Sequence, residues 1–116
     1  GWDTHAKNHE LTAGRVAILD PAFAALVRDL AKRDTLKDTV VLCLGEFGRT
    51  PKVNPLGGRD HWPHNFCAAL AGGGIRGGVV VGESDPDGGK SLKDPVQVED
   101  LHATVLTALG IDINRT

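Results

Sequence analysis

The feature that most constrains the fold is an uninterrupted run of β-branched and apolar residues at positions 39–44 (TVVLCL). Such a run is typical of a strand that is covered on both faces. Residues 45–58 are rich in glycine and proline, so we expect a long loop after the strand. The strand then delivers Glu46 to the edge of a sheet, where open α/β folds bind their ligands.

Helical periodicity flanks this strand on both sides. Between residues 12 and 34, apolar residues spaced by three and four form one face of a helix. Because proline suits the first helical position better than the interior, we expect a helix over 21–33 with Asp20 as its N-cap, preceded by a looser turn or a short helix. The same periodicity predicts a helix over 98–109, closed by Gly110.

Further short apolar segments predict more strands. Residues 66–71 resemble a second buried strand, and residues 79–81 a third, followed by a polar turn over 83–90. Strands that alternate with helices predict an α/β fold, in which helices pack on the faces of a parallel or mixed sheet.

Composition limits the class of protein. With 116 residues the chain is one domain at most, and 41% hydrophobic with 24% charged residues argues against disorder. A net charge of −2 gives no electrostatic reason to expect a nucleic acid or an acidic membrane as partner. No apolar stretch approaches the ~20 residues of a membrane span. Cys43 and Cys67 are too far apart in sequence for a metal or redox motif, so we expect buried free thiols.

Carboxylate and imidazole side chains occur in three clusters: residues 1–5 (GWDTH), 45–51 (GEFGRTP) and 58–64 (GRDHWPH). These groups together are the usual ligands of zinc and similar divalent ions. Asp3 and His5 share one face if the backbone is extended, although two solvated polar residues would give the same pattern.

Glu46 is the strongest candidate from the residues themselves. A carboxylate at the end of a buried strand is costly to desolvate unless it is paired, hydrogen-bonded or bound to metal. We therefore favour a metal or catalytic role for Glu46, and the alternative is a structural ion pair with Arg49.

The last cluster lies in a loop, where histidines have no core to fill. Trp62-Pro63 stiffens the chain beside His61, which makes His61 the better ligand candidate. His64 is then expected to hydrogen-bond a substrate oxyanion or a metal-binding side chain. The alternative is that these histidines are surface residues without such a role.

Arg49 and Arg59 are the candidate anion-binding groups. A guanidinium matches phosphate or sulfate oxygens in bidentate fashion, which an ammonium cannot do. Surface salt bridges are the alternative for both residues.

Together with residues 100–106 (DLHATVL) and 109–112 (LGID), the three clusters resemble, in the same order, the C-terminal half of a sulfatase-like bacterial family. This family is domain of unknown function 1501 (DUF1501), in the alkaline phosphatase and sulfatase superfamily. The resemblance covers nearly the whole chain. It implies that residues 1–116 are a single partial domain, the C-terminal part of a longer protein, with an alkaline-phosphatase-like three-layer αβα sandwich on a mostly parallel sheet.

The resemblance also implies a ligand set. Carried over from the superfamily, the metal ligands are Asp3, His5, Glu46 and His61. Phe47 stands where the phosphatases have a second ligand, and His61 where sulfatases have lysine. The resemblance thus implies one divalent ion, zinc, calcium or manganese, in place of a two-zinc phosphatase site. Neither cysteine lies in a sulfatase modification motif, so the nucleophile is expected upstream of residue 1.

The leading hypothesis is the C-terminal part of a metal-dependent hydrolase for sulfate or phosphate esters of a small molecule or glycan, with Arg49, Arg59 and His64 as catalytic residues. The fragment alone is expected to be inactive. The alternatives are a superfamily relative that has lost catalysis and serves as a binding or surface module, and a phosphomutase-like isomerase. Members of the family are often exported, which suggests an exported or periplasmic parent, although this chain carries no targeting signal. The sequence leaves the oligomeric state open.

Overall fold

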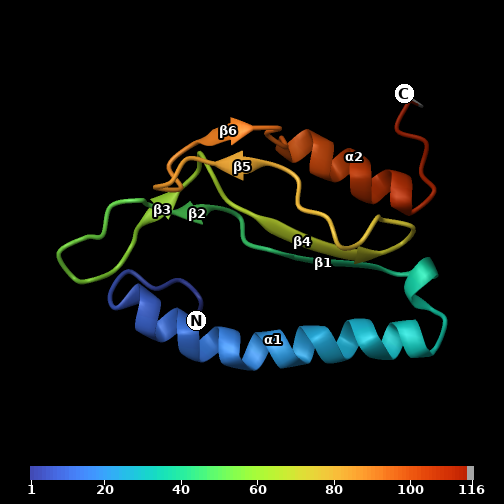
Figure 1. Cartoon of the computed structure of the whole chain (residues 1–116), viewed down its shortest axis with the longest axis horizontal. Helices are drawn as coiled ribbons and strands as arrows, with labels where there is room; N and C mark the ends of the chain where they lie inside the picture. The colour runs from blue at the N-terminus through green and yellow to red at the C-terminus, as the bar shows by residue number, and fades with distance from the viewer. Residues whose placement is uncertain (115–116) are drawn as a thin grey trace.

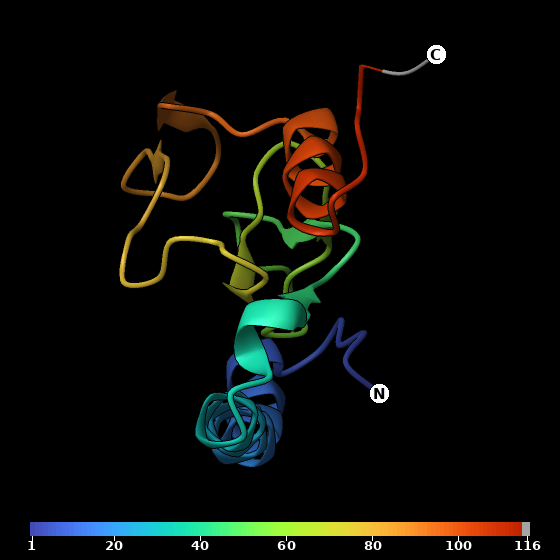
Figure 2. The same ribbon diagram turned by 90° about the vertical axis from the view of Figure 1, so that its right-hand side faces the viewer.

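The computed structural model describes residues 1–114. Its elements are α1 (Asn8–Lys32), the short 3₁₀ helix η1 (Leu36–Asp38), β1 (Val40–Leu44), β2 (Gly48–Arg49), β3 (His61–Trp62), β4 (Ala68–Gly72), β5 (Glu83–Ser84), β6 (Ser91–Lys93) and α2 (Val98–Ala108). The β1–β4 pair lies between α1 on one side and α2 with the β5–β6 hairpin on the other (Figure 1, Figure 2). None of the helices described is long and apolar enough to cross a membrane.

The predicted three-layer sandwich with a mostly parallel sheet is wrong. The strands of residues 1–114 form three separate two-stranded antiparallel pairs, β1–β4, β2–β3 and β5–β6. A parallel pair needs a long crossover, usually a helix. The connection between β1 and β4 instead contains three prolines and folds into the β2–β3 hairpin, so the chain reverses and Leu44 pairs with Ala68.

The helix break predicted at Pro21 does not occur. Helix α1 runs through Pro21 without interruption and ends at Lys32, so Asp20 is an interior residue and no N-cap. An interior proline removes one hydrogen bond and costs ~3 kcal/mol. Because helix formation is cooperative, the long helical segments on both sides of Pro21 carry the helix past it.

The segment 79–81 is not a strand, contrary to the prediction. Val80 is 94% exposed and has no strand partner, and Gly78 and Gly82 on either side adopt positive φ angles. Two short strands form nearby instead: β5 lies at the start of the predicted turn over 83–90, and β6 follows directly after it. The high β propensity of three valines is therefore insufficient to form a strand here, because no other strand of residues 1–114 lies beside them to pair with.

The segment 98–109 was predicted correctly as a helix. In α2 the side chains of Gln97 and Asp100 form a capping box, with Asp100 accepting from the Gln97 backbone N–H at 2.9 Å. At the other end Gly110 has φ 76° and donates its N–H to Thr107, as expected of a C-terminal glycine. The predicted strands 39–44 and 66–71 correspond to β1 and β4 within two residues.

No hydrophobic side chain among the described residues is buried. The accessible surface is 8581 Å², whereas a compact monomer of this mass exposes about 6,000 Å². The radius of gyration of 16.4 Å likewise exceeds the ~13 Å of a compact domain. The prediction of a strand covered on both faces is therefore wrong for β1, and so is the prediction of buried thiols, because Cys43 is half-buried and Cys67 exposed.

Candidate metal centre

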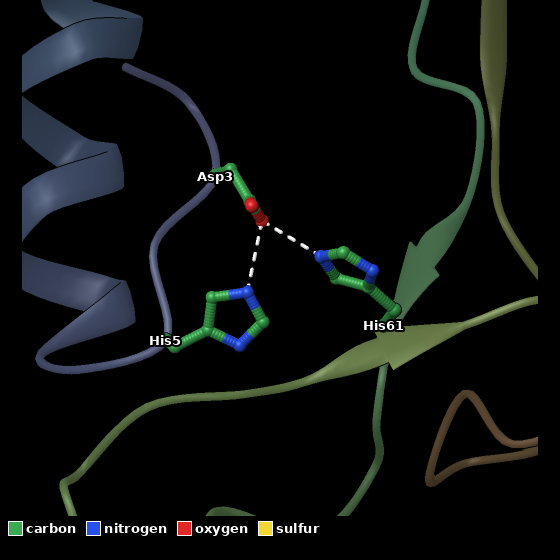
Figure 3. A group of neighbouring side chains, drawn as sticks. All are labelled: Asp3, His5 and His61. Atoms are coloured by element: carbon green, nitrogen blue, oxygen red, sulfur yellow. Dashed lines mark hydrogen bonds and ion pairs between the residues drawn. The ribbon is translucent and has the colours of Figure 1, made fainter.

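The first residues of the chain are anchored by a small buried polar group. Thr4 is 6% exposed, and its hydroxyl accepts a hydrogen bond from the Asn8 side-chain amide at 2.8 Å. The Thr4 backbone N–H donates to Trp2, and its carbonyl accepts from Arg49. With Thr4 held inward, the side chains of Asp3 and His5 on either side of it point to one site (Figure 3).

His61 reaches the same site from β3. Its strand pairs with β2, in a register that sets Arg49 opposite His61. The Phe47 ring, just before β2, stacks on the His61 imidazole with 3.8 Å between ring centroids. Gly48 permits this hairpin, because a Cβ there would lie 2.1 Å from the Asn65 carbonyl oxygen.

Three side chains converge on one oxygen atom of Asp3. Asp3 Oδ1 lies 3.1 Å from His5 Nε2, 2.8 Å from His61 Nε2 and 2.8 Å from Arg49 Nη2. The ligand atoms of Asp3, His5 and His61 all lie within 4.8 Å of one another (Figure 3). The Asp3 side chain is 60% exposed and both imidazoles 45%, so the group is open to solvent and to a ligand.

The other nitrogen of His5 has its own carboxylate. His5 Nδ1 lies 3.0 Å from Asp60 Oδ1, which also accepts from the Asn54 side-chain amide at 3.1 Å. The same Asn54 amide donates to the His5 carbonyl at 2.9 Å. The His5 ring therefore lies between two carboxylates, Asp3 at Nε2 and Asp60 at Nδ1.

Both carboxylates stay ionised to low pH. Hydrogen bonds from His61 and then from Arg49 lower the pKa of Asp3 to about 2. Hydrogen bonds from His5 and then from Asn54 lower the pKa of Asp60. In each case donors that favour the anion are the cause of the lowered pKa.

In this arrangement a neutral His5 ring has one proton to share between two carboxylates. If the neutral His5 ring donates Nδ1–H to Asp60, its Nε2 carries a lone pair. That lone pair faces Asp3 Oδ1, which is also an acceptor, at 3.1 Å. Two acceptors at this distance repel each other unless a proton on Nε2 or a metal ion lies between them.

The donor set fits a divalent transition metal. Two imidazole nitrogens and one carboxylate oxygen are typical of catalytic zinc, whose ligand distances of about 2.0–2.2 Å place neighbouring ligand atoms roughly 3.3–3.6 Å apart. The two separations from Asp3, 2.8 and 3.1 Å, are shorter than that spacing, and the three ligand atoms together lie within 4.8 Å of one another, so the side chains would shift to coordinate an ion. Calcium prefers a shell of oxygens, so this set favours zinc or manganese over calcium.

The structure does not bring Glu46 into this group. Its side chain is exposed and forms no hydrogen bond or ion pair within residues 1–114. The ion pair foreseen as its alternative is absent there as well, because Arg49 pairs with Asp3. Glu46 follows β1 where the antiparallel partner β4 begins, so the carboxyl end of β4 lies at the other end of the pair and the shared strand edge that was expected does not form.

The remaining predicted residues have other contacts. Arg59 donates to the carbonyls of Thr50 and Pro51 at 2.6 and 2.7 Å. Arg49 donates to three carbonyls besides Asp3, those of Trp2, Thr4 and Arg59. His64 is exposed, with its ring edge-on to Trp62 at 4.8 Å. Both guanidinium groups are thus engaged with the backbone.

Sequence analysis assigned no role to Asp60 and found no signal for Asn54. Asp60 directly precedes His61 in the third cluster, and that adjacency was the available clue. Asn54 lies among prolines and glycines as an ordinary turn residue, with its Oδ1 accepting from Leu56 and Gly58 backbone N–H groups. The Asn54 contacts with His5 and Asp60 form only in the folded loop, so no local sequence pattern predicts them.

Comparison with known proteins gives a family and nothing more specific. No curated protein and no solved structure matches the chain. One family model does match, and it spans residues 1–116. The chain therefore belongs to the DUF1501 family, whose description is a protein of unknown function.

Proposed function

We propose that this chain supplies the metal-binding part of a hydrolase that cleaves sulfate or phosphate esters. The observation that carries the proposal is the convergence of His5 and His61 on Asp3 in an exposed group with the donor set of a catalytic zinc site. The motif resemblance to the alkaline phosphatase and sulfatase superfamily supports the same type of reaction.

The residues of the candidate metal centre have the following roles in this proposal. Asp3, His5 and His61 would hold the ion, and Arg49 fixes the Asp3 carboxylate through its Nη2 contact at 2.8 Å. The Phe47 ring fixes the plane of His61 by stacking on it. A bound divalent ion supplies Lewis-acid polarisation of a sulfate or phosphate oxygen.

The nucleophile is expected outside these residues. The two hydroxyls beside the group are engaged, since Thr4 accepts from Asn8, and Thr50 donates to the Lys52 carbonyl and accepts from the Asp60 N–H. The predicted role of His64 toward a substrate oxyanion stays a prediction. In this proposal the metal ligands come from this chain, and the nucleophile that attacks the ester comes from elsewhere in the parent protein.

Metal titration of the chain by calorimetry tests the proposal first. We expect one Zn²⁺ or Mn²⁺ per chain, and at least a tenfold weaker affinity in Asp3→Asn and in His61→Ala. His9→Ala is the matched control, because His9 is exposed and makes none of these contacts. Glu46→Ala is expected to change affinity less than twofold. An unchanged affinity in His61→Ala would exclude the centre.

Hydrolysis by the full-length parent tests the second step, with p-nitrophenyl sulfate and p-nitrophenyl phosphate as substrates. Turnover that disappears in His61→Ala and persists in His9→Ala supports the hydrolase. A catalytically inactive binding module is the second candidate, favoured by the engagement of Arg49 and Arg59 with backbone carbonyls. Stoichiometric metal without any turnover would favour this second candidate.

A further inference from the structure

We propose that Asp60 is a positioning residue that holds His5 in the Nδ1–H tautomer and so directs the lone pair of Nε2 at the metal-binding group. The inference rests on the proposed function, because that group is the proposed metal centre. Asp60, to which the sequence pattern assigned no role, is held in place by several contacts.

The backbone of Asp60 is held on both sides by one residue. The Asp60 N–H donates to the Thr50 hydroxyl at 3.1 Å, and the Asp60 carbonyl accepts from the Thr50 N–H at 2.9 Å. Thr50 and Asp60 belong to the two arms of the hairpin that forms β2 and β3. The Asp60 carboxylate therefore projects from a rigid ladder, which a positioning residue requires.

Asn54 braces both members of the Asp60–His5 pair. Its amide nitrogen donates to Asp60 Oδ1 at 3.1 Å and to the His5 carbonyl at 2.9 Å. The orientation of this amide is fixed, because its oxygen accepts from the backbone N–H groups of Leu56 and Gly58. Asp60 Oδ1 is thus locked in place opposite His5 Nδ1 at 3.0 Å.

Close packing holds the His5 backbone in the same frame. A Cβ on Gly58 would lie 2.1 Å from the His5 carbonyl oxygen, so the two backbones are in direct contact. With the backbone fixed and Nδ1 bonded to Asp60, rotation of the ring is restricted at both ends. Metal-binding histidines commonly donate their second nitrogen to a carboxylate, which fixes the tautomer and strengthens the ligand.

The test measures the tautomer of His5 directly in the metal-free chain. Long-range ¹H–¹⁵N correlation spectra at alkaline pH, where an ordinary imidazole is neutral, distinguish Nδ1–H from Nε2–H. We expect Nδ1–H for His5 in the wild type, assigned with His5→Ala. We expect conversion toward Nε2–H in Asp60→Ala and retention of Nδ1–H in Asp60→Asn, whose amide oxygen can still accept. Asp87→Ala, in an exposed turn, is the control.

Affinity for Zn²⁺ and for Mn²⁺ gives the second readout. We expect about a 10–100-fold loss in Asp60→Ala and a smaller loss in Asp60→Asn. An Nε2–H tautomer in the wild type overturns the proposal, as does equal affinity in a folded Asp60→Ala. If Asp60→Ala fails to fold, as judged by its amide spectrum, the wild type and Asp60→Asn decide.

The outcomes also separate this inference from the proposed function. A wild-type chain that shows the Nδ1–H tautomer, converted by Asp60→Ala, but binds neither Zn²⁺ nor Mn²⁺ supports the role of Asp60 and refutes the metal centre. A chain that binds Zn²⁺ equally well with and without Asp60 supports the metal centre and refutes the positioning role.

Discussion

Replacing Gly58 with alanine tests whether the close contact between the two loops builds the candidate centre. The new Cβ would lie 2.1 Å from the His5 carbonyl oxygen, 2.4 Å from its carbon and 2.7 Å from the Ala6 nitrogen. Real Cβ contacts essentially never fall below 3.0 Å, so the two backbones must separate by about 0.9 Å. All of these atoms are backbone, which cannot yield as a flexible side chain does.

The size of the effect follows from that displacement. Overpacking of a fitted site costs about 1–3 kcal/mol, and we expect a loss of this size in the free energy of unfolding. Metal-ligand distances tolerate about 0.2 Å, so a shift of His5 by several tenths of an ångström should also weaken Zn²⁺ binding at least tenfold. Urea unfolding followed by tryptophan fluorescence suits the measurement, because Trp2 and Trp62 flank the site.

Gly77→Ala is the matched control. Gly77 also lies in a loop with an ordinary φ angle, and a Cβ there meets no atom within 4 Å. We expect its unfolding free energy to stay within about 0.5 kcal/mol of the wild type. If Gly58→Ala unfolds at the same urea concentration as Gly77→Ala and binds Zn²⁺ as the wild type does, the contact between Gly58 and His5 does not build the site.

Three further predictions use other contacts of the molecule. The contacts of ionised Asp3 stabilise the fold above its ordinary pKa of 3.8, and this contribution is lost as pH falls toward about 2. The stability difference between wild type and Asp3→Asn should therefore disappear between pH 4 and pH 2, and a constant difference would refute the assignment. Arg49→Lys cannot bridge Asp3 and three carbonyls, so amide exchange at Thr4 should accelerate at least tenfold, and unchanged exchange would contradict this role. The isolated chain should bind the dye ANS through its exposed apolar side chains, less in Leu44→Lys than in the wild type, and absence of dye binding would contradict the open fold.

Local elements were predictable where the local signals agreed. Residues 98–109 show helical spacing and are followed by Gly110, and α2 forms there. The direction of strand pairing was not predictable, because it depends on the path of the chain between β1 and β4. Nothing in the two strand sequences distinguishes a parallel from an antiparallel partner, since both are short apolar runs.

The candidate site was predictable in part for a similar reason. Asp3, His5 and His61 lie together as their motifs suggested, whereas Glu46 was placed by the assumption of a shared sheet edge that the antiparallel pairs do not provide. The roles of Arg49 and Asn54 could not be predicted, because they arise from backbone carbonyls that only the folded loops bring within reach.

In the proposed hydrolase, the charges of the site would make a bound cation necessary to attract an anionic substrate. Asp3 and Asp60 are both ionised, and Arg49 is the cation in contact with Asp3. With neutral imidazoles the group then carries one net negative charge, which repels sulfate and phosphate esters. A divalent ion at the same point changes the net charge to one positive unit, and at contact distances this reversal outweighs any single surface charge. Because Arg59 is held by carbonyl oxygens, a bound ion would be the part of the proposed site that attracts an anion.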